Sequence, residues 1–199
     1  VGGAVRDQLL GREPKDLDFV VVGATEVELL AAFPTAVKQG AAFPVYRVEG
    51  LGEIALARRE RKTGLGHTGF EVEFGPEVTL EEDLSRRDLT INAMAMNMAT
   101  GEIVDPFNGR GDLSLKLLRH VSPAFADDPL RVYRVARFAA QLGFSVAAET
   151  TALMRTLMGE LHTLSAERVC EELRKALRSP SPYLFFQELK AAGVLCIHF

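Results

Sequence analysis

Apolar and polar residues in the first 60 positions change period every few residues, which is typical of alternating short helices and strands. Glycines at 11 and 23 and the proline at 34 end these segments, and Thr25 predicts a helix N-cap. Helices are expected over 3–10 and 25–33, and strands over 17–22, 36–38, 44–48 and 53–58. The pattern predicts an α+β fold, a small mixed β-sheet with helices.

The middle of the chain carries weaker signals. Thr79 and Glu82 form a capping-box pattern that predicts a helix start. The apolar, methionine-rich segment 91–98 predicts a second helix, and 111–119 a short third one. The glycine-rich stretch 62–75 lacks a helical period and is expected to form a loop over the functional site.

After Pro123 the pattern becomes helical throughout, with expected helices over 130–142, 147–158, 166–178 and 182–192 and no further strand. We therefore predict a catalytic head over 1–121, a helical neck over 122–180, and the start of a helical body over 181–199. Both ends of the sequence look cut, so further C-terminal domains are expected beyond it.

The amino-acid composition limits the classes of protein to which this chain can belong. The chain has 199 residues, 47% of them hydrophobic, with a formal net charge of -4 and a pI of about 5.7. No overall basic charge attracts nucleic acid, so an RNA partner would need a local basic surface. Two cysteines are too few for a disulfide framework. With no membrane-spanning run and no signal peptide, a cytoplasmic protein with no membrane partner is expected.

The candidate chemistry begins at the N-terminus. Gly2 and Gly3 precede a short helix, where free N–H groups and the helix dipole favour phosphate. Asp16 and Asp18 are two apart, and such side chains on a strand share one face, roughly 7 Å apart. Mg²⁺ prefers a few carboxylates plus substrate phosphates, so a nucleotide and metal site is one interpretation. The alternative is a chance D-x-D in which Asp16 ends a loop.

Two other segments could contribute to that site. Glu53 starts a predicted strand that could lie beside the one bearing Asp18, where it could help hold metal or accept a proton. A solvated edge glutamate is the alternative. Arg86 and Arg87 could bind triphosphate oxygens in a bidentate manner or could simply end a helix in solvent.

A second cluster lies at the start of the helix expected over 130–142. Asp128, Arg131 and Arg134 are spaced to share one side of that helix, with Arg137 further round it. A carboxylate only accepts hydrogen bonds and a guanidinium only donates them. Cytosine and adenine both offer an amino donor beside a ring-nitrogen acceptor, whereas uracil and guanine offer the reverse. An Asp/Arg pair therefore suits C and A, unless these charges form a purely solvated face.

Other nucleotide or metal sites are not indicated. The sequence contains neither G-x-x-x-x-G-K-[ST] nor G-x-G-x-x-G, and no histidine stands in an H-E-x-x-H pattern.

Together these motifs resemble the tRNA nucleotidyltransferases (CCA-adding enzymes) of the bacterial and eukaryotic class, which share their catalytic head with bacterial poly(A) polymerases. The resemblance covers nearly the whole chain. It rests on Gly2-Gly3-x-Val5-Arg6-Asp7 with Asp16-x-Asp18, Arg86-Arg87-Asp88-Leu89-Thr90-Ile91-Asn92-Ala93, Asp105-Pro106-Phe107-Asn108-Gly109, Asp127-Asp128-x-x-Arg131 and Glu167-Arg168-Val169-x-x-Glu172. The family usually has Glu-Asp where this chain has Asp127-Asp128.

The resemblance implies template-independent addition of C, C and A to tRNA 3′ ends from CTP and ATP, with release of pyrophosphate. Asp16 and Asp18 would then hold two Mg²⁺ ions. By the same resemblance, nucleotide contacts fall to Gly3, Arg6, Arg87, Asp128, Arg131, Arg134 and Arg137. Such enzymes usually continue into body and tail domains that grip the tRNA, sometimes with a histidine-aspartate phosphohydrolase domain.

Three alternatives stay open. A bacterial poly(A) polymerase would use the same chemistry with ATP alone. A single-activity relative would add only CC or only A. A catalytically silent RNA- or nucleotide-binding module would bind without transfer, although the intact pair of aspartates argues against it.

Overall fold

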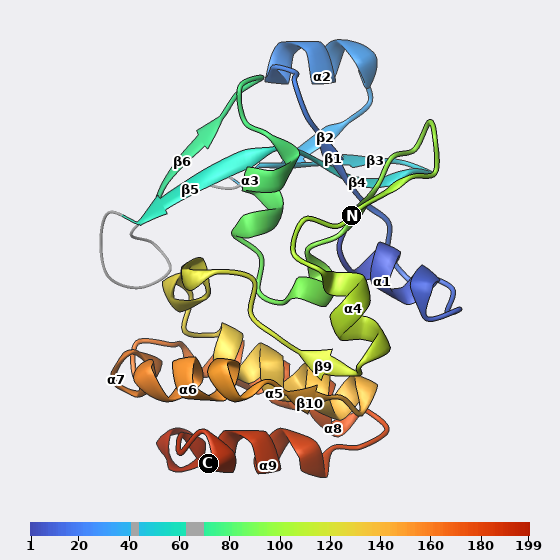
Figure 1. The fold of residues 1–199 in the computed structure, drawn as a ribbon. Helices are drawn as coiled ribbons and strands as arrows, with labels where there is room; N and C mark the ends of the chain where they lie inside the picture. The colour runs from blue at the N-terminus through green and yellow to red at the C-terminus, as the bar shows by residue number, and fades with distance from the viewer. Residues whose placement is uncertain (41–43, 63–69) are drawn as a thin grey trace.

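The computed structural model describes residues 1–40, 44–62 and 70–199. A sheet with helix α2 forms the upper part in Figure 1, and helices α5 to α9 form the lower part. Helices α1, α3 and α4 lie between them. The α+β fold with a helical C-terminal part is therefore confirmed.

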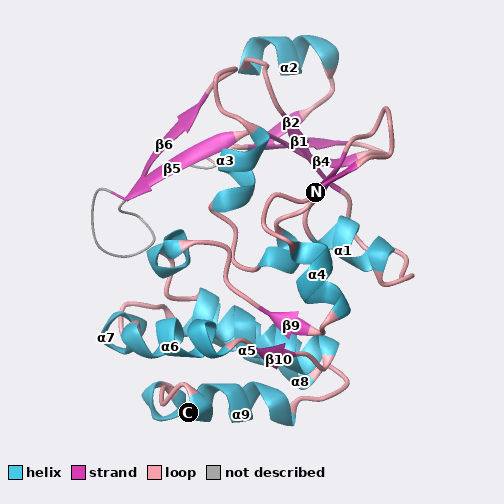
Figure 2. Ribbon diagram, in the orientation of Figure 1, coloured by secondary structure: helices cyan, strands magenta, loops and turns pink. Residues whose placement is uncertain are grey.

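The main sheet has four strands in the order β1-β4-β3-β2. Strand β1 pairs in parallel with β4, and the other neighbours are antiparallel (Figure 2). The strands are β1 (Asp18–Val21), β2 (Val37–Gln39), β3 (Val45–Val48) and β4 (Gly52–Leu56). Helix α2 (Glu26–Ala32) starts at the capping box of Thr25 and packs Leu29 against buried Tyr46 and Ile54.

A separate hairpin corrects two sequence predictions. The strand expected over 53–58 ends at Leu56, and β5 (Arg58–Lys62) then pairs antiparallel with β6 (Phe70–Phe74). Part of the segment expected to be a loop over 62–75 is thus a strand; residues 63–69 lie outside the described residues. The residues of β6 alternate apolar and polar, which is the period of a strand, so the sequence carried this signal inside the glycine-rich stretch that was expected to be a loop.

The methionine-rich helix expected over 91–98 is also wrong. A 3₁₀ turn, η1 (Thr90–Asn92), is followed by strand β7 (Ala95–Met96), which pairs with β8 (Ile103–Val104). Ile91 and Met94 are fully buried. A short apolar run buried in this way cannot be distinguished from a helix by periodicity alone. Helix α1 (Gly3–Leu9) and the capped helix α3 (Leu80–Ser85) agree with the sequence.

The helical part packs around α5 (Arg131–Leu142), and this core also takes in Ile91 of η1, Leu113 of α4 and Leu118, which lie before it in the chain. Its other helices are α6 (Ala148–Thr156), α7 (Met158–Leu161), α8 (Ala166–Leu177) and α9 (Tyr183–Ala191), with 3₁₀ turns η2 (Pro123–Asp127) and η3 (Leu195–Ile197). Gly143 ends α5 in a left-handed conformation with φ of 71°, as the sequence indicated.

One strand pair joins the two parts. Helix α4 (Gly109–Ser114) is shorter than the expected 111–119, because β9 (Leu117–Leu118) follows it. Strand β9 pairs in parallel with β10 (Ser145–Val146), so the expectation of no strand after residue 121 is wrong. The division at 121 stays a prediction.

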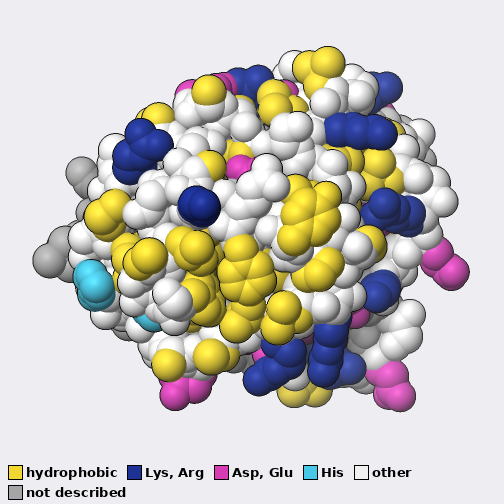
Figure 3. All heavy atoms as spheres, turned by 90° about the horizontal axis from the view of Figure 1, so that it is seen from below, with side chains coloured by type: hydrophobic (Ala, Val, Ile, Leu, Met, Phe, Trp, Pro, Cys, Tyr) yellow, Lys and Arg dark blue, Asp and Glu magenta, His cyan; other side chains and the backbone are white. Residues whose placement is uncertain are grey.

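The surface below the helical part shows hydrophobic side chains gathered in one area, with Lys and Arg side chains beside it (Figure 3). Met158, Leu177, Tyr183 and Phe199 are large exposed hydrophobic residues of the helical part. Within the described residues, no helix is long and apolar enough to span a membrane.

Candidate functional site

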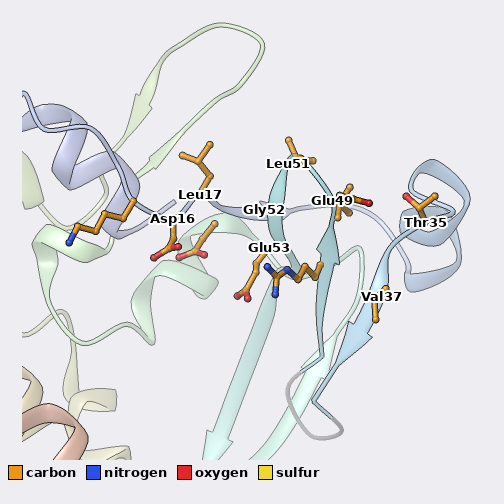
Figure 4. A pocket seen from close by; sticks show the side chains of 13 residues that line it. Asp16, Leu17, Thr35, Val37, Glu49, Leu51, Gly52 and Glu53 are labelled. Carbon is orange, nitrogen blue, oxygen red and sulfur yellow. The ribbon is translucent and has the colours of Figure 1, made fainter. Parts of the chain in front are cut away.

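The acidic edge of the sheet lies where the sequence predicted it. Asp18 begins β1 and is in register with Glu53 on β4. Asp16 precedes the strand, in a bend, so it ends a loop as the alternative interpretation expected, yet it still lies beside Asp18 along one hollow. In Figure 4 the carboxylates of Asp16 and Glu53 extend toward the same side, and Leu17 points the opposite way.

These carboxylates suit a hard cation. Asp16 and Asp18 are exposed, and within the described part of the chain neither side chain has a hydrogen-bond or ion-pair partner. Among the described residues, no group of three or more His, Cys, Asp and Glu side chains forms a ready metal cage. Two open carboxylates fit Mg²⁺, because this ion commonly completes its shell with water and substrate phosphate.

All ten predicted site residues line one hollow of about 920 Å³ between the sheet edge and α5. They are Gly3, Arg6, Asp16, Asp18, Glu53, Arg87, Asp128, Arg131, Arg134 and Arg137. The carboxylates lie on the sheet side, and the arginines of α5 lie on the helical side. One wall thus suits cations and the other suits anions, which is what a metal-bound nucleotide requires.

Gly2 and Arg87 meet at the entry to α1. Gly2 has φ of 67°, and a Cβ there would lie 2.7 Å from Arg87 Nη1. Glycine at this position therefore relieves backbone strain and also lets the guanidinium approach the chain.

Asp83 holds both arginines of the Arg86-Arg87 pair. It is 1% exposed and accepts hydrogen bonds from Arg86 Nη2 at 2.6 Å and Arg87 Nη2 at 3.2 Å. Burial alone would raise the pKa of Asp83, but the charges of Arg86 and Arg87, with help from the Arg58 amide, outweigh burial and lower it. The arginines are therefore anchored by a buried anion, so the solvated helix end is the weaker interpretation.

The arginines of α5 are held in the same way. Arg134 donates a hydrogen bond from Nε to Asp88 Oδ2 at 2.8 Å, and its Nη2 forms an ion pair with the same oxygen at 2.7 Å. Arg137 donates to Glu172 on α8 and stacks over Phe138, its guanidinium carbon 3.9 Å from the ring centroid. The purely solvated face is excluded for these two residues.

The Asp128 and Arg131 pair differs from the prediction. Helix α5 begins at Arg131, and Asp128 lies before it with extended backbone, so the two do not share a helix face. Asp128 accepts from Arg168 at 2.9 Å, whereas Arg131 donates to the carbonyls of Ala124 at 2.5 Å and Arg86 at 2.6 Å. Both still line the hollow, each fixed by its own partners.

Sequence reasoning left several lining residues out of the predicted site. They are Gly2, Arg86, Asp88, Asn92, Leu130, Phe138, Gln141, Arg168 and Lys175. Gln141 lies one helical turn beyond Arg137 and bonds to it at 2.9 Å, so i,i+4 spacing was an available signal. Lys175 carries no such signal, because α8 reaches the hollow only through the tertiary fold.

Comparison with known families adds an independent observation. Residues 1–119 match the family model described as "Poly A polymerase head domain". The chain belongs to this family. Residues 143–199 match a second model, described as "Probable RNA and SrmB- binding site of polymerase A".

Two curated relatives carry the name Multifunctional CCA protein. The Haemophilus ducreyi protein is 56% identical over 205 residues, covering 100% of this chain and 49% of its own length. The Pseudomonas aeruginosa protein is 58% identical over 201 residues, covering 98% of this chain and 48% of its own. The chain thus spans about half the length of these relatives.

Solved structures of CCA-adding enzymes share the fold. The Bacillus stearothermophilus enzyme in complex with CTP has a TM-score of 0.78 at 33% identity and covers 98% of this chain and 47% of its own. A CCA-adding enzyme with ATP has a TM-score of 0.78 at 30% identity, with 98% and 46% covered. The Thermotoga maritima enzyme complexed with tRNA has a TM-score of 0.76 at 29% identity, also with 98% and 46% covered.

Proposed function

We propose that the protein adds C, C and A to tRNA 3′ ends from CTP and ATP, with release of pyrophosphate. One observation carries this proposal: all ten predicted site residues line a single hollow, with Asp16, Asp18 and Glu53 on the sheet side and the arginines of α5 on the helical side. The names of the relatives and the CTP, ATP and tRNA complexes of similar structures support the same substrates.

In the proposed reaction, the terminal 3′ oxygen of the tRNA bonds to the α-phosphorus while the bond to the β-phosphate oxygen breaks. Asp16 and Asp18 would hold two Mg²⁺ ions, which supply charge neutralisation and activation of the hydroxyl when bound. Glu53, in register with Asp18 on the neighbouring strand, would accept the hydroxyl proton. Arg6 and Arg87 face the phosphates and sugar from the head.

Residues on the helical side of the hollow would select the base. Asp128 accepts and Arg131 donates, which suits the amino group and ring nitrogen of C and A. Arg168 steadies Asp128, and Arg134 and Arg137 support the base or the triphosphate. A site that leaves buried polar groups unpaired with U or G rejects them by factors of up to about 10⁴–10⁵.

The wider setting of this activity is also proposed. The head, neck and body divide near residues 121 and 180, and further C-terminal domains grip the tRNA. The protein would act in the cytoplasm, where its tRNA substrate is processed.

The test is incorporation of single labelled nucleotides into tRNA that lacks its 3′ CCA, in the presence of Mg²⁺. We expect C, and then A, to be added, and neither U nor G. Addition of A alone to any RNA would support a poly(A) polymerase, a candidate that the name of the head-domain model favours. Binding of nucleotide without incorporation would support the silent module.

A matched variant tests the metal assignment. Asp18→Ala should abolish transfer and leave the folded state intact, because Asp18 is exposed and has no side-chain partner among the described residues. Circular dichroism monitors the fold. Retained turnover would contradict the role of Asp18.

A further inference from the structure

A chain of polar contacts crosses the hollow from α1 to α5. Arg6 Nη1 donates to Asn92 Oδ1 at 2.5 Å, and Asn92 Nδ2 donates to Asp88 Oδ1 at 3.0 Å. Asp88 Oδ2 then accepts a hydrogen bond from Arg134 Nε at 2.8 Å and forms an ion pair with Arg134 Nη2 at 2.7 Å. The chain joins two arginines that lie 128 positions apart in sequence, one on each wall of the hollow.

Asn92 is the link that requires a particular side chain. It lies between a guanidinium, which only donates, and a carboxylate, which only accepts. A short amide offers an acceptor to the first and a donor to the second. Aspartate would keep the acceptor and place a second anion beside Asp88, and alanine would lose both contacts. Asn92 is 7% exposed, so water replaces the lost contacts poorly.

The two arginines also share an aromatic neighbour. The guanidinium carbon of Arg6 lies 5.2 Å from the centroid of the Phe138 ring, and that of Arg134 lies 5.7 Å from it. Two like charges beside one ring repel each other unless anions and dipoles hold them in place. Asp7 holds Arg6 from α1, with its Oδ1 2.9 Å from Nε and 2.8 Å from Nη2. Asp88 and Asn92 supply the restraint that joins the two arginines, from the side of η1.

Both arginines line the hollow that holds Asp16 and Asp18. Arg6 comes from α1, next to the acidic sheet edge, and Arg134 comes from α5, next to Arg131. A nucleotide that spans the hollow would meet Arg6 with its phosphates and Arg134 nearer its base. The distance between the two guanidinium groups therefore matters for binding one nucleotide at both ends.

We propose that Asn92 is a positioning residue that fixes Arg6 relative to Arg134, so that the two walls bind one nucleotide together. The inference rests on the proposed nucleotidyl transfer. Asn92 acts through the two arginines and performs no chemical step.

The first test compares Asn92→Asp and Asn92→Ala with the unaltered protein, using the complete natural protein that carries this sequence. We expect KM for CTP and for ATP to rise about tenfold or more in both variants, the size of a lost hydrogen bond to a charged group. A merely structural role would lower the active fraction, and so the apparent kcat, without changing KM. Asn97→Asp is the control, because Asn97 is exposed and outside the hollow; its KM should not change.

The second test measures coupling between the arginines. Arg6→Gln and Arg134→Gln are made singly and together, with Asn92 intact and with Asn92→Ala. With Asn92 intact, the double variant should deviate from the product of the single effects on kcat/KM by about threefold or more. With Asn92→Ala the effects should simply multiply. Equal coupling in both backgrounds, or an unchanged KM in the first test, would overturn the proposal.

Nucleotide binding by itself separates this inference from the proposed function. Dissociation constants of fluorescent ATP and CTP analogues are measured for the same variants without RNA. If the unaltered protein binds these analogues but transfers nothing, the proposed function fails, and the coupling is read from the dissociation constants instead.

Discussion

Replacing Asp88 by asparagine tests how much the ion pair between the two parts contributes to stability. Asp88 is 6% exposed and accepts hydrogen bonds from the Leu89 amide, from Asn92 and from Arg134 Nε. It also forms an ion pair with Arg134 Nη2 at 2.7 Å. The substituted amide would keep the shape of the side chain but lose its charge. Breaking a buried pair costs about 3–5 kcal/mol. The Arg134 side chain is 35% exposed and can regain water, so we expect the lower end, about 3 kcal/mol.

The assay is reversible urea unfolding, with thermal melts as a second measure. A loss of about 3 kcal/mol corresponds to a fall in Tm of about 6–12 °C for a chain of this size. Glu171→Gln is the matched control, because its pair with Arg174 joins side chains that are 45% and 58% exposed. An exposed pair contributes at most about 1 kcal/mol. If Asp88→Asn costs no more than this control, the reasoning is refuted.

The pH dependence gives a second signature of the same pair. Burial alone would raise the pKa of Asp88, but the charge of Arg134, the hydrogen bonds from Asn92 and Arg134 and the charge of Arg131 together lower it far below its ordinary value. The stabilisation is therefore fully present above the unfolded pKa, about 3.9, and is lost as pH falls toward the folded pKa. The difference in unfolding free energy between the unaltered protein and Asp88→Asn should stay constant above about pH 5 and shrink below about pH 4.

Three other substitutions test separate features. Gly52→Ala should lower the free energy of unfolding by more than the roughly 1–2 kcal/mol expected of left-handed strain alone. Gly52 has φ of 126°, and a Cβ there would also lie 2.3 Å from the Leu17 carbonyl oxygen. Gly50→Ala is the control in the same urea titration, because Gly50 has φ of 77° and a Cβ there would meet open space. Arg131→Ala should relax the choice of C and A over U and G more than it weakens triphosphate binding, and an unchanged preference in single-nucleotide incorporation would contradict its base-reading role. Glu53→Gln should lower kcat by about 10²–10⁴ at unchanged nucleotide affinity if Glu53 accepts the proton; unaltered single-turnover rates would instead identify a solvated edge residue.

Local signals predicted the helices with clear capping residues well and the short strands poorly. The capping boxes of Thr25 and Thr79 and the left-handed Gly143 act within a few residues, so the sequence alone reveals them. Strand β6 and the β7–β8 pair depend on partners 7 or more positions away. The buried apolar run 91–98 has no distinctive period, which explains why it was expected to be a helix. Residues 70–74 do alternate with the period of a strand, but they lie in the glycine-rich stretch that was expected to be a loop.

The sequence likewise predicts some features of the site and not others. Open carboxylates and a row of arginines are visible in the sequence because their residue types carry the chemistry. Which arginine is held and which can meet a ligand depends on distant anions and dipoles: Asp88 lies 46 positions from Arg134, and Asn92 lies 86 from Arg6. A buried carboxylate costs free energy unless it is paired, so each one marks an arginine whose position is fixed by the fold. An arginine that is already held in place loses little conformational entropy when a nucleotide binds. Long side chains that are free in solvent would lose more, so the buried carboxylates preorganise this wall for binding.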